Sequence, residues 1–214
     1  MARMDRTRRP TRRLTQEKRF LIVVEGDVTE REYIEAIKRS RHMKSVEVRV
    51  EQGNTDPVGI VSEAKRIRDS ARKAEPFDDV WSVFDVEAKL TQRARPGLQE
   101  AINAAERAGI KSAISNPCFE IWLCWHSAEQ NAWIASEVAQ RRCTELGITQ
   151  EARAKHLRDA DMLIADGYMT AKCRAASMEQ THDRNGTTRP EDRNPSSGMY
   201  KLIDAIFVAF PART

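Results

Sequence analysis

The sequence lacks long apolar runs and paired cysteines, and each absence excludes a class of protein. No run of about eighteen apolar residues occurs, so we expect no membrane-spanning helix and no membrane partner. The four cysteines, Cys118, Cys124, Cys143 and Cys173, form no CxxC pair and no zinc-ligand spacing, so we expect free thiols. The N-terminal arginines precede no apolar segment of the kind found in secretory signals. These absences favour a cytoplasmic protein.

Positive charge is concentrated at the N-terminus. Residues 1–19 hold eight Lys or Arg and two acids, a net charge of +6, while the whole chain has +4, which leaves −2 for the remainder. An arm of this composition is too polar to fold alone, and nucleic-acid phosphates attract it. A solvated tail that aids solubility is the alternative. The candidate nucleic-acid contacts in this arm are Arg8, Arg9, Arg12 and Arg13.

Apolar segments alternate with helical patterns in the first half of the chain, which indicates an α/β fold. Continuous aliphatic runs, typical of strands buried on both faces of a parallel sheet, occupy residues 20–24 and 80–84, and further strands are expected over 46–50 and 110–114. Helices are expected over 29–41, 57–73 and 96–108, the first opened by a Thr29–Glu32 capping box and the second by Asp56 and Pro57. This order predicts a four-stranded, mostly parallel sheet flanked by helices.

The pattern changes to helices alone from Cys118 onward. Helices are expected over residues 118–125, 151–165, 168–179 and 197–210, with a basic loop over 182–196 that contains Gly186, Pro190 and Pro195. The length suits one domain with an addition. We therefore expect an arm over 1–19, an α/β core over 20–127 and a helical extension over 128–214.

Two of the expected strands end in carboxylates. Glu25-Gly26 follows the first, and Asp85-Val86-Glu87 follows the strand over 80–84. Ligands of open α/β sheets bind beyond the carboxyl ends of the strands, and Gly26 permits close approach of a ligand to the backbone. In an extended chain Asp85 and Glu87 point to the same side. The alternative is that these acids only cap the helices that follow.

Four motifs occur in the order that marks the RloB family of prokaryotic proteins. They are Val23-Val24-Glu25-Gly26, Phe84-Asp85-Val86-Glu87, Ser115-Asn116-Pro117-Cys118-Phe119-Glu120-Ile121-Trp122-Leu123 and Asn194-Pro195-Ser196-Ser197. The chain resembles that family over residues 20–210, and the family's core resembles a Toprim domain. This resemblance implies a four-stranded parallel sheet in which Glu25, Asp85 and Glu87 hold Mg²⁺ or Mn²⁺ and act in catalysis. The Toprim acidic pair is usually Asp-x-Asp, and the longer Glu87 would hold an ion differently or through water.

Several further residues are candidates for the same site. Glu120 lies among apolar residues, and we expect it to face the cleft as a catalytic residue; the alternative is that it interacts with the amides of a helix start. The expected cleft-shaping residues are Gly26, Asn116, Asn194 and Ser196, although Asn116 could instead cap the helix that follows. Lys172 and Arg174 are candidate phosphate contacts.

The resemblance implies a metal-dependent nuclease that cleaves RNA or DNA. It also implies an effector role in prokaryotic anti-phage defence, with an ATPase as partner. The alternative is a non-catalytic Toprim-like subunit that binds nucleic acid or a partner protein. The apolar face of the final helix suits either an oligomer contact or the core.

Overall fold

The structure is a computed structural model that describes residues 18–26, 28–50, 56–71, 73, 75–88, 96–150 and 153–211. The predicted contacts of the arm, at Arg8, Arg9, Arg12 and Arg13, lie outside the described residues. None of the helices in these ranges combines the length and the apolar character that crossing a bilayer requires.

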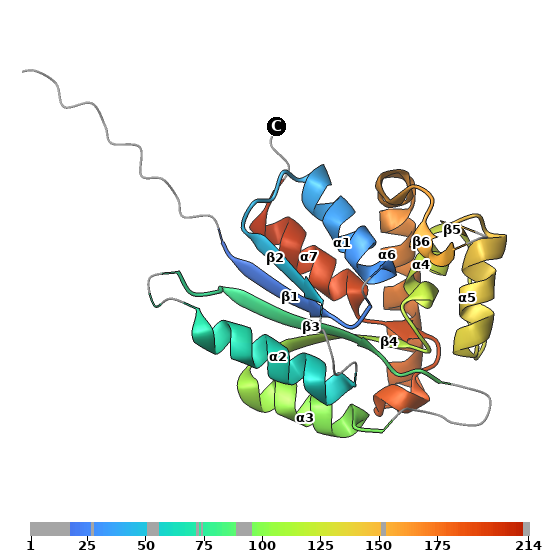
Figure 1. Ribbon diagram of the computed structural model, residues 1–214. Helices are drawn as coiled ribbons and strands as arrows, with labels where there is room; N and C mark the ends of the chain where they lie inside the picture. The colour runs from blue at the N-terminus through green and yellow to red at the C-terminus, as the bar shows by residue number, and fades with distance from the viewer. Residues whose placement is uncertain are drawn as a thin grey trace, which may run out of the picture.

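A five-stranded sheet with the order β2-β1-β3-β4-β7 forms the centre of the molecule (Figure 1). Its strands are β1 (Phe20–Val24), β2 (Val46–Val50), β3 (Asp79–Asp85), β4 (Lys111–Asn116) and β7 (Ser196–Ser197). Strands β2, β1, β3 and β4 are parallel, as predicted from the alternation of strands and helices along the chain. The two-residue β7 adds an antiparallel edge strand that was not predicted.

Helices cover both faces of the sheet, which explains why the central strand β1 is apolar without alternation. On one face lie α1 (Thr29–Ser40) and α7 (Met199–Ala209), and on the other lie α2 (Pro57–Ser70) and α3 (Leu98–Ala108) (Figure 1). Alternate residues of β1 therefore enter two different cores: Ile22 packs on the α1 side and Leu21 on the α2 side.

The C-terminal half contributes helices to the α1 side of the sheet. These are α4 (Glu120–Ser127), α5 (Ser136–Glu145) and α6 (Ala160–Arg184), followed by a short 3-10 helix, η1 (Pro190–Asp192). Trp122 of α4 and Tyr168 of α6 are buried in the same core as the α1 side of β1. The predicted helical extension thus shares a hydrophobic core with the sheet.

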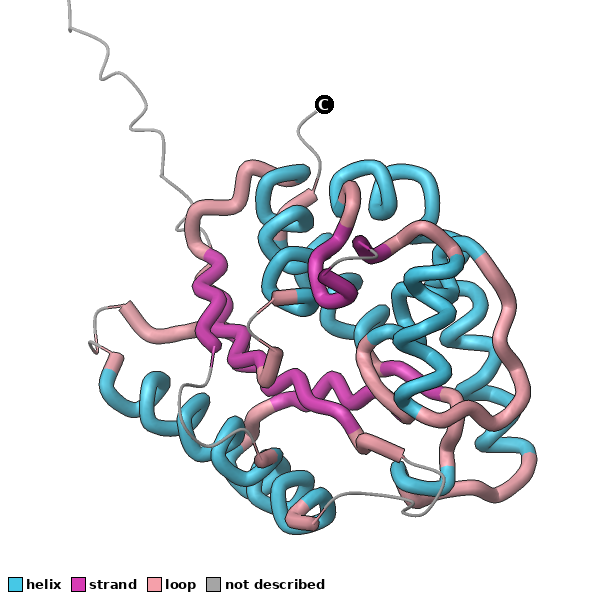
Figure 2. The backbone as a smooth tube through the Cα atoms, turned by 45° about the vertical axis from the view of Figure 1, so that its right-hand side comes forward, coloured by secondary structure: helices cyan, strands magenta, loops and turns pink. Residues whose placement is uncertain are grey.

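The predicted helix over 151–165 is wrong for residues 153–157, whereas residues 160–165 are helical. The chain instead forms an antiparallel hairpin of β5 (Thr149–Gln150) and β6 (Arg153–Leu157), separate from the central sheet in Figure 2. Contacts with α1 hold β6 extended: the Thr29 hydroxyl donates to the Lys155 carbonyl (2.6 Å), and the Leu157 N–H donates to Glu32 (2.8 Å). Helix propensity is a weak preference that such tertiary contacts override. Helix α6 then begins at Ala160.

Helix starts follow the prediction at α2 but not at α1. The Asp56 carboxylate accepts a hydrogen bond from the Gly59 N–H (2.7 Å), which confirms it as the cap of α2. At α1 the residue before the helix is Val28, and its side chain makes no capping bond. The predicted capping box is wrong because Thr29 and Glu32 both turn to β6 instead.

Candidate functional site

The parallel register of β1 and β3 brings the first two predicted carboxylates together. Val24 lies opposite Val83, so both strands end at the same edge of the sheet. Glu25 follows β1 directly, and its Oε2 accepts a hydrogen bond from the backbone N–H of Asp85 (3.4 Å). The structure therefore places Glu25 beside Asp85, beyond the carboxyl ends of the strands, where open α/β sheets bind their ligands.

Asp85 connects this edge to the start of α4. Its Oδ2 accepts a hydrogen bond from the N–H of Phe119 (3.1 Å), the residue before the helix. Glu120 is the first residue of α4, and only 8 % of its surface is exposed. Asp85 thus satisfies a backbone group at the start of α4 and not of α3, the helix that follows β3, and it also lies close to other carboxylates.

Glu30 is a fourth acid at this site, and the sequence reasoning missed it. It is the second residue of α1, and a Cβ atom added at Gly26 would overlap its carboxylate. Gly26 therefore makes room for the Glu30 side chain. The signal that could have found Glu30 is its position: the first turn of a helix that follows a strand end lies over the same edge of the sheet.

Burial and mutual repulsion perturb the titration of these acids. Burial, and then the charges of Glu120 and Glu25, raise the pKa of Glu30 to about 7, although its own backbone hydrogen bond and Lys155 act in the opposite direction. Burial, followed by the charges of Glu30, Glu25 and Glu120, raises the pKa of Asp85 well above its usual range. We refer to Glu25, Glu30, Asp85 and Glu120 as the acidic cluster. Its excess negative charge is what a bound cation would offset.

Burial and the charges of the acidic cluster also affect the cysteine next to it, Cys118. Burial raises the pKa of the Cys118 thiol, and the charges of Glu120 and Asp85 raise it further. A thiol is nucleophilic only as the thiolate. Cys118 is therefore a packing residue in this environment.

Glu87 lies beyond the end of β3, and the backbone changes direction there. The strand ends at Asp85, and Glu87 has a φ of 53°, in the left-handed region. Its N–H donates to the Pro117 carbonyl (2.8 Å). The premise that an extended backbone holds Asp85 and Glu87 on one side is therefore wrong, and a metal-binding role for Glu87 stays a prediction.

The acidic cluster fits a hard divalent cation by the chemistry of its donors. Carboxylate oxygens are the ligands that Mg²⁺ and Mn²⁺ prefer. Among the described residues, no group of three or more His, Cys, Asp or Glu side chains is already arranged to hold a metal ion. Mg²⁺ usually keeps several waters and takes only one or two carboxylates, so two acids of the cluster would suffice.

The two predicted asparagines bind each other and join distant segments. The Asn194 amide donates to Asn116 Oδ1 (2.9 Å), and its Oδ1 accepts from the Ile134 N–H (2.9 Å). Asn116 donates to the Pro190 carbonyl (2.8 Å), so it does not cap the helix that follows. Both asparagines precede cis prolines. Ser196 lies opposite Asn116 in the β4–β7 pair. These residues support the segment that leads from β4 to α4.

The predicted phosphate contacts of α6 are engaged within the protein. Lys172 Nζ donates to Asp204 (2.8 Å), and Arg174 donates to the Trp125 carbonyl (2.5 Å). Their role in nucleic-acid binding stays a prediction.

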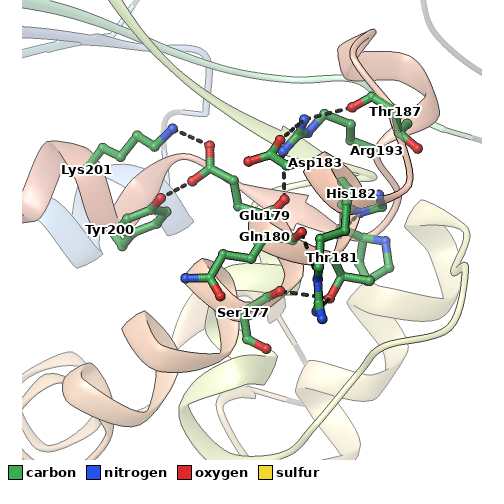
Figure 3. Close-up of polar contacts among 12 residues, drawn as sticks. Ser177, Glu179, Gln180, Thr181, His182, Asp183, Thr187, Arg193, Tyr200 and Lys201 are labelled. Atoms are coloured by element: carbon green, nitrogen blue, oxygen red, sulfur yellow. Dashed lines mark hydrogen bonds and ion pairs between the residues drawn. The ribbon is translucent and has the colours of Figure 1, made fainter.

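The predicted basic loop over 182–196 begins later, because α6 continues to Arg184, and the end of α6 holds this loop, as Figure 3 shows. Arg193 donates to the Asp183 carboxylate (2.8 Å), the Thr187 carbonyl (2.8 Å) and the Glu179 carbonyl (3.1 Å). The Glu179 carboxylate accepts hydrogen bonds from Tyr200 and Lys201 of α7. Arg193 therefore acts as a structural brace between α6 and the loop.

Comparison with known proteins gives one match. The family model described as RloB-like protein matches residues 20–206, which is most of the chain. No curated protein and no solved structure matches.

Proposed function

The chain belongs to the RloB-like protein family, and on that premise we propose that it is a metal-dependent nuclease that cleaves phosphodiester bonds of RNA or DNA. The observation that carries the proposal is the convergence of the acidic cluster: four carboxylates from three separate segments of the sequence lie close together at the carboxyl edge of β1 and β3. We further propose that this core is Toprim-like. The parallel order β2-β1-β3-β4 and the placement of Glu25 and Asp85 support that classification.

The residues of the cluster suit different parts of such a reaction. Glu25 and Asp85 would hold Mg²⁺ or Mn²⁺, with Glu87 as a further predicted ligand. When bound, the ion neutralises charge on a phosphate oxygen and lowers the pKa of a water molecule. Glu30, with a pKa of about 7, can accept or return a proton near neutral pH, which is the requirement for a general base or acid. Glu120 contributes by raising the pKa of Glu30.

The biological setting is proposed from the family resemblance. We propose an effector of prokaryotic anti-phage defence that acts in the cytoplasm with an ATPase partner. A non-catalytic subunit that binds nucleic acid or a partner is the second candidate. One observation favours it: in the described part of the chain the carboxylates are not already arranged around a metal position.

Cleavage assays distinguish these functions. Purified protein is incubated with total tRNA and with plasmid DNA, each in Mg²⁺, Mn²⁺ or EDTA, beside Asp85→Asn and Glu30→Gln. Glu106→Gln, at an exposed position of α3, is the matched control. The proposal predicts metal-dependent cleavage by the wild type and the control, and at least a hundredfold slower cleavage by the two cluster variants.

Two results would contradict the proposal. Cleavage by Asp85→Asn at the wild-type rate would show that the acidic cluster is not the active site. Salt-sensitive binding without cleavage in any metal, also after addition of a candidate ATPase partner, would favour the non-catalytic alternative.

A further inference from the structure

A cavity lies beside the acidic cluster, between α1 and the β5–β6 hairpin. Its volume is about 500 Å³, and it extends from Val28 and Arg31 at the start of α1 to Arg158 at the end of β6. Val28 precedes Glu30 by two residues. On the β6 side, Lys155 is close enough to Glu30 for its charge to lower the pKa of that carboxylate. The cavity and the cluster therefore share the first turn of α1.

The acids that line this cavity are already engaged by neighbouring groups. Glu32 accepts hydrogen bonds from His156 (2.8 Å) and from the Leu157 N–H (2.8 Å). Asp161 pairs with Arg39 (3.0 Å), and Glu35 pairs with Lys38 (3.0 Å). The last of the lining acids caps α6, where Asp159 accepts from the Met162 N–H (2.9 Å). Each lining carboxylate is thus partly or fully compensated.

Three basic residues in or beside the cavity have no ion-pair partner among the described residues, unlike the lining residue Arg39, although the charge of Lys155 still acts on Glu30. Arg31, Lys155 and Arg158 are exposed, and across the described ranges no carboxylate lies within ion-pair distance of any of them. Arg158 Nε donates to the Thr149 carbonyl at 3.4 Å, which leaves its terminal nitrogens available. We refer to Arg31, Lys155 and Arg158 as the basic track: Arg31 and Arg158 line the cavity, and Lys155 lies beside it on β6, close to Glu30.

We propose that this basic track binds the phosphate backbone of the nucleic acid on one side of the bond to be cleaved, an inference that rests on the proposed nuclease function. Cations that hold flanking phosphates fix the position of a substrate without reading its bases. The acidic cluster by itself repels a polyanion. The neighbouring cations of the basic track would attract the nucleic-acid strand and direct it to the cluster.

The spacing of the track favours a polynucleotide over a single phosphate group. At most about 10 Å of chain separates the Cα atoms of Lys155 and Arg158, and their odd spacing directs the two side chains differently, which suits contacts with two phosphates. A nucleic-acid strand presents successive phosphates along such a length. Because the contacts are to the backbone, the track would bind strands of different sequence with similar affinity.

Binding of a labelled oligonucleotide at several salt concentrations tests the proposal. Fluorescence anisotropy is recorded in EDTA with the full chain carrying Asp85→Asn, so that cleavage cannot interfere. Two double variants are made in this background: Arg31→Gln with Arg158→Gln, and the charge-preserving pair Arg31→Lys with Arg158→Lys. The control is Arg107→Gln on the far face of the sheet, because Arg107 is also exposed and also lacks a pairing carboxylate among the described residues.

The expected result is a change in the salt dependence of binding. The double Gln variant should bind roughly tenfold or more weakly. Its slope of log affinity against log salt should fall by about 1.4 for a single strand, since each lost phosphate contact contributes about 0.7. The Lys pair should keep most of the slope, and Arg107→Gln should match the parent.

Three outcomes would overturn the inference. The first is an unchanged slope in the double Gln variant, and the second is an equal loss in Arg107→Gln. The third is competition by inorganic phosphate as strong, per phosphate, as competition by an unlabelled oligonucleotide, which would assign the cavity to a small phosphate ligand. Cleavage is measured separately with Asp85 intact. If the wild type cleaves but the double Gln variant keeps the salt slope of the parent, only the basic track is refuted. If the double Gln variant has a reduced salt slope but the wild type does not cleave, only the nuclease proposal is refuted.

Discussion

Glu30→Gln tests the electrostatics of the acidic cluster through the stability of the protein. In the folded protein burial, followed by the charge of Glu120, raises the pKa of Glu30 from 4.5 to about 7. The fold therefore favours the protonated carboxyl. The contribution of the protonated Glu30 carboxyl to the free energy of unfolding is fully present below pH 4.5 and is lost as the pH rises through about 7. The loss corresponds to about 3 kcal/mol, an upper limit because the side chain is only half-buried.

Glutamine stays neutral at every pH, so the variant should avoid this loss. We expect Glu30→Gln to melt higher than the wild type at pH 8 in EDTA, by up to about 6–12 °C, since 1 kcal/mol corresponds to roughly 2–4 °C at this size. At pH 4 the two proteins should melt within about 1 °C of each other, because Glu30 is then protonated. Thermal unfolding followed by circular dichroism measures both, with Glu106→Gln as the control. A variant that is less stable than the wild type at pH 8, or equally stabilised at both pH values, would refute the reasoning.

Three further predictions concern polar contacts within the fold. Tyr33→Phe should lower the free energy of unfolding by about 1–3 kcal/mol, because His126 Nδ1 donates to the Trp122 carbonyl and leaves Nε2 to accept from Tyr33 (3.0 Å); a neutral result in urea unfolding would contradict this pairing. Arg193→Ala should cost about 2–3 kcal/mol in the same measurement, through its three hydrogen bonds, and a cost below about 0.5 kcal/mol, typical of surface sites, would show that it is no brace. Asn194→Asp should cost about 2–4 kcal/mol, because the change removes both amide donors and buries a charge; retention of wild-type stability at pH 8 would argue against the amide network.

The sheet was predictable because its signal is local. The aliphatic run of β1 shows that both faces are buried, and the two cores on either side of Ile22 and Leu21 confirm it. Glu25 and Asp85 follow from the same reasoning, since residues after parallel strands meet at one edge.

The β5–β6 hairpin and Glu30 were not predictable from local patterns. Residues 153–157 have ordinary helix propensity, and contacts from Thr29 and Glu32, more than a hundred residues away, keep them extended. Thr29 and Glu32 fit a capping box by spacing, yet the same distant strand takes both side chains. The position of Glu30 depends on how α1 begins relative to Gly26, which spacing alone does not give.

The most direct test of the central claim, that the acidic cluster binds a divalent cation, is a calorimetric titration of Mn²⁺ into the protein at pH 8. The account predicts saturable binding to the wild type and to Glu106→Gln, and at least a tenfold weaker or undetectable signal for Asp85→Asn. Equal binding by the wild type and Asp85→Asn, or no saturable binding by the wild type, would contradict it.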